Sequence, residues 1–311
     1  MRFLVLALVA ATLAFAPFAV PWLRFVFIVA LASGFAALGV AILLRAGLIS
    51  IGHALFYAVG AYAVAFMMRD LGVRDLAVLI AASVLLSGVA GAIVGAFMVR
   101  YRAIFFAMLN LAVSMVVFSL LSKLYGITGG SDGLRVATPT LFGSVLDRGT
   151  FNTTFLYVVL GLFVVAGVLV DLYLRSPMGE ALTAVHTNEV RLEYLGVSVW
   201  GVLLAAYVVS AMLAGLGGAL AGIAIGHIVP EMAYWTESGH FVLVAVFGGI
   251  GGVAGPFIGS VFLEILRTFA SGYAAESWNL VVGVALLLVI FFLPEGLYGL
   301  GARLFGRGER K

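Results

Sequence analysis

The stretch GVLLAAYVVSAMLAGLGGALAGIAI, residues 201–225, contains no charged side chain. The hydrocarbon core of a bilayer is about 30 Å thick, and a helix of about 20 apolar residues crosses it. The stretch is therefore long enough to form a transmembrane helix. Lipid gives helices no hydrophobic reason to associate, but small residues such as Gly218 and Gly222 let neighbouring backbones pack closely. The stretch predicts a membrane-spanning helix with tightly packed neighbours.

Apolar blocks of similar length recur along the whole chain. Of its 311 residues, 64% are hydrophobic and 10% are charged, whereas about a quarter of the residues in a soluble domain are charged. The blocks lie near residues 3–23, 25–44, 46–68, 76–99, 103–121, 154–174, 201–225, 241–266 and 279–293. This pattern excludes a soluble globular protein. It predicts an all-α polytopic membrane helix bundle that forms a single transmembrane domain over residues 1–311.

The eighth block contains an interruption. Its central stretch GGIGGVAGPFIG (248–259) combines glycines with a proline, which interrupt a straight helix. Two short spans or a broken, re-entrant pair both fit this stretch, so we expect about nine or ten transmembrane helices. Two further glycine pairs, Gly91 with Gly95 and Gly255 with Gly259, have the four-residue spacing of helix packing contacts.

Several kinds of chemistry are excluded by what the sequence lacks. There is no cysteine, so disulfides, thiolate metal sites and cysteine nucleophiles cannot form. The four histidines, at positions 53, 186, 227 and 240, include no pair at i, i+4 spacing, and we assign no catalytic and no metal-binding residue. A P-loop needs a Gly-Lys pair, and none occurs. We therefore expect no cofactor in this chain, and ATP chemistry must belong to a partner.

The few charges of the chain bear on its orientation in the membrane. The formal net charge is only +3, and the basic residues lie mostly between apolar blocks, which favours control of topology over nucleic-acid binding. An excess of Lys and Arg marks the cytoplasmic side, so the basic tail (301–311) places the C-terminus in the cytoplasm. The stretch RYR (100–102) and residues 176–196 then lie inside as well. The stretch RDLGVRD (69–75) and the loop 122–152 lie outside.

The longest charge-rich run between apolar blocks is SPMGEALTAVHTNEVRLEYLG (176–196). Ser176 can cap the free N–H groups of a helix, and the proline that follows suits the first helical position. Thr187 or Asn188 can cap a second short helix, and Gly196 is a natural end for it. The run therefore predicts two short helices joined by a turn.

Two helices this short cannot cross a bilayer, so they lie along its surface or against another protein. The apolar residues of the first helix recur at spacings of three and four: Met178, Ala181, Leu182 and Val185. A helix that lies among lipid headgroups is rich in basic residues. Here glutamates, among them Glu180 and Glu189, outnumber arginines, which favours docking to another protein.

Polar residues within the apolar blocks are candidates for a solute path. Ser50, His53 and Tyr57 recur at spacings of three and four, so one face of a helix would carry them. Asn110 and Ser114 form a second such pair. Polar and ionisable groups inside a span usually face the bundle interior and mark a path. Hydrogen bonding between packed helices explains the same residues, and both interpretations stay open.

Two polar features lie outside these pairs. Glu264 is deep in the eighth block, where it fits a coupling proton or, as we favour, an ion pair with Arg267. The stretch TGGSDGL (128–134) combines glycines with Ser131 and Asp132, whose side chains hydrogen-bond their own turns. The turn needs no role other than a structural one, and solute contact there is the alternative.

Six stretches, which follow one another in family order, resemble the permeases of ABC transporters for branched-chain amino acids, the LivH/LivM type. The stretches are GLISIGHALFYAVGAYAVA (47–65), TGGSDGL (128–134), SPMGEALTAVHTNEVRLEYLGVSV (176–199), AAYVVSAMLAGLGGALAG (205–222), GGIGGVAGPFIGSVFLEIL (248–266) and FFLPEGLYGL (291–300). The resemblance spans about residues 30–300, and TGGSDGL is closer to LivM.

This resemblance implies a permease subunit and a set of partners. Two cytoplasmic ATP-binding subunits would bind ATP and Mg, a second permease subunit would complete a heterodimer, and an extracytoplasmic binding protein would deliver the solute. The chain would span a bacterial-type cytoplasmic (inner) membrane, in contact with lipid and without nucleic acid. The solute would be a branched-chain amino acid or a related small neutral or zwitterionic molecule, with urea and short amides as alternatives.

The resemblance also gives roles to particular residues. Residues 176–196 would be cytoplasmic coupling helices in a cleft of an ATPase, with their apolar side chains buried at the contact and their glutamates near basic surface. The coupling residues would be Met178, Glu180, Ala181, Asn188, Glu189 and Gly196. Ser131 and Asp132 would lie on the external side, near the solute-binding protein.

Two other function classes compete with an ABC permease. A stand-alone ion-coupled secondary transporter needs intramembrane ionisable groups or broken helices, and Glu264 and the interrupted eighth block supply both. That class does not explain the capped double helix of residues 176–196. A purely structural assembly subunit would leave Ser50, His53 and Tyr57 without a solute role.

Overall fold

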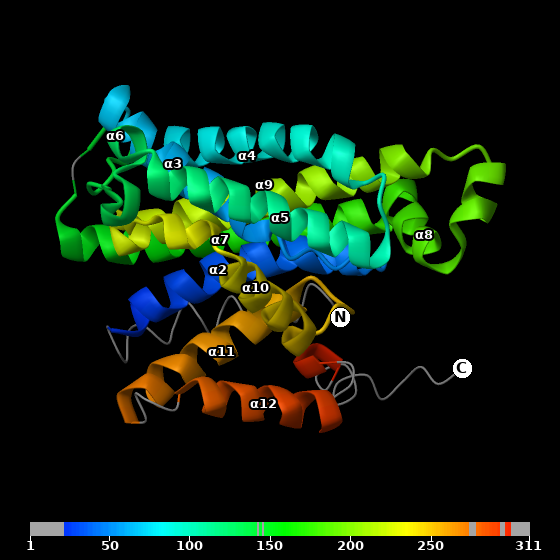
Figure 1. Cartoon of the computed structure of the whole chain (residues 1–311). Coiled ribbons are helices and arrows are strands. Elements are labelled where there is room, and N and C mark those ends of the chain that lie inside the picture. Colours follow the sequence, from blue (N-terminus) through cyan, green and yellow to red (C-terminus); the bar gives the residue numbers. More distant parts are fainter. Residues whose placement is uncertain (1–21, 142, 145, 274–277, 293–295, 300–311) are drawn as a thin grey trace.

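The structure of the chain is a computed structural model that describes residues 22–141, 143–144, 146–273, 278–292 and 296–299. It is helical almost throughout (Figure 1). The α-helices are α2 (Leu23–Leu44), α3 (His53–Asp70), α4 (Leu76–Met98), α5 (Ala103–Lys123), α6 (Tyr125–Thr128), α7 (Arg148–Arg175), α8 (Pro177–Tyr194), α9 (Val199–Ile225), α10 (Trp235–Gly248), α11 (Ala254–Tyr273) and α12 (Trp278–Phe292). The connections contain the 3-10 helices η1 (Gly130–Asp132) and η2 (Pro230–Ala233) and the short strands β1 (Leu134–Arg135) and β2 (His227–Ile228). Most of the first expected block and the basic tail lie outside the described residues.

The helix α9 is buried along most of its C-terminal half, and it packs against α2, α3 and α4. Glycines make these contacts close. A side chain at Gly218 would overlap the backbone carbonyl of Tyr57 in α3, and one at Gly91 in α4 would overlap the side chain of Ala211. The close packing that the glycine spacing predicts is therefore confirmed for these helices.

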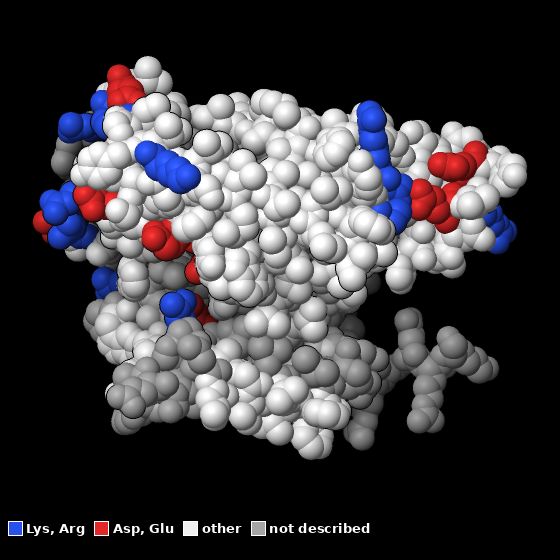
Figure 2. Space-filling model, viewed as in Figure 1, with Lys and Arg blue, Asp and Glu red and all other residues white. Residues whose placement is uncertain are grey.

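The described helices fit a bundle that spans a membrane. Among the described residues, five helices are long and apolar enough to cross a bilayer by themselves: α2, α4, α5, α7 and α9. Charged side chains gather near the two ends of the molecule, and most of the surface between them is uncharged (Figure 2). The chain is an all-α polytopic membrane bundle, and the number of nine or ten crossings stays a prediction.

The eighth apolar block is broken, as the sequence predicts. It forms α10 and α11, which are separated by residues 249–253. The 14 residues of α10 give a helix of about 21 Å, shorter than the hydrocarbon core of a bilayer. Side chains at Gly248 and Gly259 would overlap the backbones of Gly255 and Val244, so the two helices form a tight hairpin.

The third block departs from the expected continuous helix. The helix α3 begins at His53, so Ser50 precedes it and does not share a helical face with His53 and Tyr57, as we expected. Gly52 packs directly on the backbone of Asn110 in α5, and irregular backbone is tolerated within a membrane where protein covers it. Ser50 reaches His53 through a side-chain hydrogen bond instead.

The connections gather at two ends of the bundle, in the grouping that the charges predict. At one end, Arg102 in the turn between α4 and α5 pairs with Glu189 of α8. At the other end, β1 pairs with β2, and Asp75 forms a bridge with Thr140. Figure 1 shows α8 at one end and α6 at the other. Which of these ends faces the cytoplasm stays a prediction.

Candidate functional site

The element α8 consists of two short helices that meet at Asn188, whose backbone is not helical (φ −161°, ψ 96°). Ser176 caps the first helix, since its Oγ accepts a hydrogen bond from the N–H of Gly179 at 3.4 Å. The Oδ1 of Asn188 accepts a hydrogen bond from the N–H of Arg191 at 2.9 Å, so Asn188 and not Thr187 caps the second helix. Gly196 follows this helix with φ +81°. The predicted pair of helices is therefore present.

The first helix of α8 buries part of its apolar face against other helices of the same chain. Leu182 and Val185 are buried, because α8 packs against α7 and α9. Their expected burial at a partner's surface is therefore wrong. Met178 is 43% exposed, Glu180 is exposed and Ala181 is half-buried, so these residues are the part of the helix that another protein can reach.

The second helix of α8 leaves large apolar side chains uncovered. Val190, Tyr194 and Leu195 are 60%, 89% and 72% exposed, at the end of the molecule and beyond the long apolar helices. Exposed apolar residues grouped in this way mark interaction surfaces. Our sequence analysis did not single out these three residues, although the i, i+4 spacing of Val190 and Tyr194 was a signal for them. Met178, Val190, Tyr194 and Leu195 are called the exposed apolar residues of α8 below.

Two connections between membrane helices hold α8 in place. The Nε and Nη2 of Arg102 donate hydrogen bonds to the two carboxylate oxygens of Glu189 at 2.9 and 2.6 Å. Both side chains are about a third exposed. In the connection after α2, Gly47 lies against the ring of His186. These contacts connect α8 to the α4–α5 turn and to the segment that leads into α3.

Two of the candidates for a solute path, Ser50 and His53, are hydrogen-bonded to each other inside the bundle. His53 is fully buried, and its two ring nitrogens are hydrogen-bonded to the hydroxyls of Ser50 (2.8 Å) and Ser210 (2.5 Å). These contacts join α3 to α9 and leave no free nitrogen for a solute. Tyr57 is also buried, and its ring centroid lies 5.0 Å from that of Phe241.

Asn110 and Ser114 have a similar structural role. The Nδ2 of Asn110 donates a hydrogen bond to the carbonyl of Phe106 at 2.8 Å, and its Oδ1 accepts one from the hydroxyl of Tyr207. The Oγ of Ser114 donates a hydrogen bond to the carbonyl of Ala233 at 2.8 Å. Both side chains are buried and tie α5 to α9 and to η2. A role for them in a solute path stays a prediction.

A set of four ionisable residues on α10 and α11 is only partly buried. Glu237, His240, Glu264 and Arg267, called the charge cluster below, lie on these two helices. Arg267 is exposed, the other three are half-buried, and the charge of Arg267 acts on each of them. The ion pair of Glu264 with Arg267 that we favoured is not formed between these two side chains, and the charge of Arg267 acts on Glu264 only at a longer distance. The i, i+3 spacing within each pair was visible in the sequence, but the approach of the two helices depends on the fold.

The external candidates Ser131 and Asp132 lie in the exposed turn η1. The hydroxyl of Tyr125 donates a hydrogen bond to Oδ2 of Asp132 at 2.8 Å. This bond and the negative charge of Asp132 raise the pKa of the Tyr125 hydroxyl. Gly129 and Gly133 on either side have positive φ angles of 74° and 68°, which glycine adopts without strain. The turn is therefore ordered by its own chain, and solute contact there stays a prediction.

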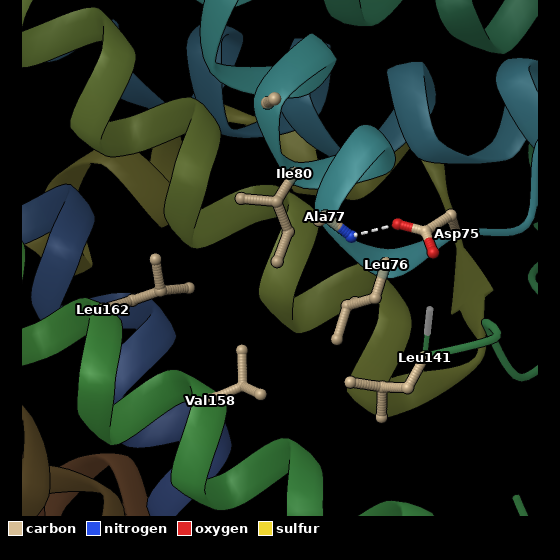
Figure 3. A pocket seen from close by; sticks show the side chains of 8 residues that line it. Asp75, Leu76, Ala77, Ile80, Leu141, Val158 and Leu162 are labelled. Atoms are coloured by element: carbon tan, nitrogen blue, oxygen red, sulfur yellow. Dashed lines mark hydrogen bonds between the residues drawn. The ribbon is translucent and has the colours of Figure 1, made fainter. Parts of the chain in front are cut away.

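A cavity between α4 and α7 is unsuited to a polar solute. Its volume is about 280 Å³, and Figure 3 shows Ile80, Val158 and Leu162 around it. Its one acidic side chain, Asp75, points to the start of α4, where Oδ1 accepts a hydrogen bond from the N–H of Ala77 at 3.0 Å. Within the described part of the chain, no group of three or more His, Asp or Glu side chains could hold a metal ion.

Comparisons with known proteins identify relatives over most of the chain. Residues 22–291 match the model of the family described as branched-chain amino acid transport system / permease component. LivM of Salmonella typhimurium and LivM of Escherichia coli, both named high-affinity branched-chain amino acid transport system permease proteins, are 30% identical to this chain over 272 residues. The alignment covers 81% of this chain and 64% of either LivM protein.

A second kind of permease is similar over the same part of the chain. LivH of Salmonella typhimurium, also named as a high-affinity branched-chain amino acid transport system permease protein, is 29% identical over 277 residues. These residues are 81% of this chain and 86% of LivH. The chain therefore spans 64% of the length of the LivM relatives and most of the length of LivH. No solved structure matches the chain.

Proposed function

Because the chain belongs to the family of permease components of branched-chain amino acid transport systems, we propose that it is a permease subunit of an ABC importer. Its solute is a branched-chain amino acid or a related small neutral or zwitterionic molecule, which the names of the LivM and LivH relatives support. The membrane is the cytoplasmic (inner) membrane of a bacterium. The chain is a transporter subunit, and its partners bind the ATP and Mg.

The observation that carries this proposal is the exposed double helix α8. Its exposed apolar residues lie beyond the membrane-spanning helices, together with the exposed Glu180. A cytoplasmic ATP-binding subunit that covers this surface removes these apolar side chains from water, which stabilises the complex. Two such subunits work with the transporter, one on each permease chain. The coupling contact includes Met178, Glu180, Ala181, Asn188, Glu189 and Gly196 and extends to Val190, Tyr194 and Leu195.

The contacts of α8 explain how an ATPase can move membrane helices. When the ATPase changes shape, it displaces α8, and the ion pair of Glu189 with Arg102 pulls on the turn between α4 and α5. The contact of His186 with Gly47 acts in parallel on the connection that leads into α3. ATP hydrolysis in a partner is thereby linked to the arrangement of α3 and α5.

Two further partners complete the transporter. A second permease subunit forms a heterodimer with this chain, and the solute passes along a path that both chains line. A solute-binding protein on the external side delivers the solute near Ser131 and Asp132, in the turn that follows α6. Lipid covers the remaining apolar surface.

The proposal is tested by affinity purification of the chain from its native membrane in a mild detergent, followed by mass spectrometry. We expect two ATP-binding subunits and a second permease to be recovered with it. The substitution Tyr194→Ser should reduce recovery of the ATP-binding subunits. Its matched control is Tyr125→Ser, which changes an exposed tyrosine at the opposite end of the bundle and should leave recovery unchanged.

A secondary transporter is the competing function, because the charge cluster lies on α10 and α11, the two helices of the broken eighth block. The purified material also decides between the two. Uptake of L-leucine into liposomes that requires ATP supports the importer. Recovery of the chain alone, with uptake driven by a proton or sodium gradient and without ATP, would refute it.

A further inference from the structure

A cavity lies where α2 and α7 begin, at the end of the bundle opposite α8 (Figure 1). Its volume is about 260 Å³. Both helices are long and apolar enough to cross a bilayer, so their first turns lie near the boundary between the hydrocarbon core and the lipid head groups. The residues that line the cavity include Trp22, Arg24, Ile28, Asn152, Phe155 and Ala224.

The half-buried Arg24 brings a positive charge to this cavity, and α7 fixes its position. Its Nη1 donates a hydrogen bond to the Oγ1 of Thr153 at 2.9 Å. The hydroxyl of Thr153 in turn donates to the carbonyl of Gly149 at 3.1 Å, so its oxygen is oriented to accept from Arg24. A guanidinium has five N–H donors, and within the described residues the Arg24 side chain makes this one hydrogen bond and no ion pair. Donors of Arg24 are therefore available to an anion.

The other polar side chains of the cavity also offer donors. Trp22 carries an indole N–H and Asn152 an amide NH₂, and neither side chain makes a hydrogen bond within the described part of the chain. The described lining contains no carboxylate. The nearest acidic residue in the sequence, Asp147, is exposed and caps α7 through the N–H of Gly149 at 3.2 Å. Arg24 therefore gives the lining a single positive charge.

The tryptophan and the apolar residues of the lining indicate the depth of the cavity in the membrane. The ring of Trp22 lies edge-on to that of Phe269 in α11, with 6.2 Å between centroids, and the side chain is 50% exposed. Tryptophan is enriched at the level of the lipid head groups, because its ring is apolar and its N–H is polar. Ile28 and Phe155, which lie further along α2 and α7, are buried and form an apolar wall.

We propose that this cavity, called the Arg24 pocket below, binds the phosphate of an anionic phospholipid, phosphatidylglycerol. The Arg24 guanidinium binds the phosphate oxygens, the N–H groups of Asn152 and Trp22 add donors, and the apolar wall contacts the first part of an acyl chain. The phosphodiester carries one negative charge, which balances the one charge of the lining. Its oxygens only accept hydrogen bonds, and a guanidinium binds phosphate through parallel hydrogen bonds. The site does not depend on which solute the chain transports.

An arginine at a helix end can also extend toward water without a specific ligand. Arg148, the first residue of α7, represents that case, because it is exposed and does not belong to the described lining. Arg24 differs from it in the hydrogen bond to Thr153 and in its place in the cavity. The two arginines have the same charge at the same end of α7, so general attraction between basic residues and anionic lipid predicts the same effect for both.

The test is native mass spectrometry of the complete transporter, purified in a mild detergent and titrated with phosphatidylglycerol. The comparison lipids have the same acyl chains. Phosphatidylethanolamine adds an ammonium group, for which the described lining has no carboxylate, and diacylglycerol lacks the phosphate. We expect phosphatidylglycerol to bind a saturable site roughly 5- to 20-fold more tightly than either. Inorganic phosphate should not displace it, because the acyl chain contributes to binding.

The variant Arg24→Gln should weaken binding at this site by roughly 5- to 20-fold, and Arg24→Lys should retain part of the affinity because the charge is kept. Asn152→Leu removes an exposed amide and should weaken binding by roughly 2- to 5-fold. The matched control is Arg148→Gln, which should bind phosphatidylglycerol normally. Recovery of the partner subunits and ATP hydrolysis report whether each variant assembles.

Four results would overturn the proposal. Equal affinity for the three lipids would show that the phosphate is not recognised, and displacement by inorganic phosphate would indicate a site for the free anion. Normal binding by Arg24→Gln would exclude this pocket, and an equal loss in Arg24→Gln and Arg148→Gln would indicate general charge attraction. The comparison of lipids uses the wild type alone, so it is decisive even if a variant fails to assemble.

Discussion

Two sets of polar side chains on the helices of this chain differ in whether the rest of the chain gives them hydrogen-bond partners. His53, Asn110 and Ser114 are buried, and each is hydrogen-bonded to another element of the bundle. Glu237 and Glu264 are half-buried and have no hydrogen bond or ion pair within the described residues. A polar group that is satisfied by its own chain stabilises a fold, whereas a group left without a partner is available to a ligand. The first set holds helices together, whereas the side chains of the second set add no such bond within the described residues.

The largest expected effect on stability is in the first set. The substitution His53→Leu removes two hydrogen bonds and leaves the hydroxyls of Ser50 and Ser210 buried without this partner. We expect a loss of about 2–4 kcal/mol in the free energy of unfolding. Thermal unfolding of the purified chain in detergent, followed by size-exclusion chromatography, measures this loss.

The control for this substitution is His227→Leu, which changes a half-buried histidine in β2 that makes no side-chain hydrogen bond within the described residues. Its unfolding temperature should stay close to that of the wild type. Normal stability of His53→Leu combined with altered transport would move His53 from the first set to the second. It would also restore the path interpretation of Ser50 and His53.

A smaller effect is expected where one hydrogen bond is removed and the packing is kept. The substitution Tyr207→Phe deletes the hydroxyl that donates to Asn110 but retains the ring, which packs edge-on against Phe56 and Phe106. The buried amide oxygen of Asn110 then lacks a donor, and we expect a loss of about 1–2 kcal/mol. The same thermal assay applies, and Tyr157→Phe, at a 42% exposed tyrosine of α7, is the control. Equal unfolding temperatures for the two variants would contradict a structural role for Asn110.

The sequence alone predicted those features of the fold that depend on local properties of the chain. The apolar blocks predicted the membrane bundle, and the glycine-rich stretch 248–259 predicted the break between α10 and α11, because chain length and backbone chemistry are local properties. The start of α3 at His53 could not be predicted in this way. It depends on Gly52 reaching the backbone of Asn110, a contact between residues that are far apart in the sequence.

The candidate site was predictable only in part for the same reason. The two helices of α8 follow from local capping residues, and the structure has them where the sequence predicts. Periodicity also indicated which residues share an apolar face, but it did not show that Leu182 and Val185 are covered by their own chain. The partner of Glu189, Arg102, is 87 positions away in the sequence and has no local signal. Polar residues were visible in the sequence, but their partners were not.

A third prediction concerns the ion pair of Arg102 with Glu189, which is partly exposed at the surface. The pair of Arg102 and Glu189 is about a third exposed, so its loss in Glu189→Gln should lower stability by only about 0.2–1 kcal/mol. We expect a larger effect on coupling: ATP hydrolysis by the complex should continue while solute uptake per ATP falls. The double variant Arg102→Glu with Glu189→Arg restores opposite charges and should recover part of the uptake. Equal uptake per ATP in the wild type and Glu189→Gln would show that the ion pair does not transmit movement of α8.

The smallest expected effect on stability is in the second set, where Glu264→Gln should change the free energy of unfolding by less than about 0.5 kcal/mol or increase it. The reason is that no hydrogen bond or ion pair of Glu264 within the described residues is lost, while the unfavourable burial of a charge is removed. The thermal assay used for His53→Leu measures this change on the same scale. A loss of more than about 2 kcal/mol would mean that the folded chain already satisfies this carboxylate. Glu264 would then belong with His53 and Asn110 in the first set.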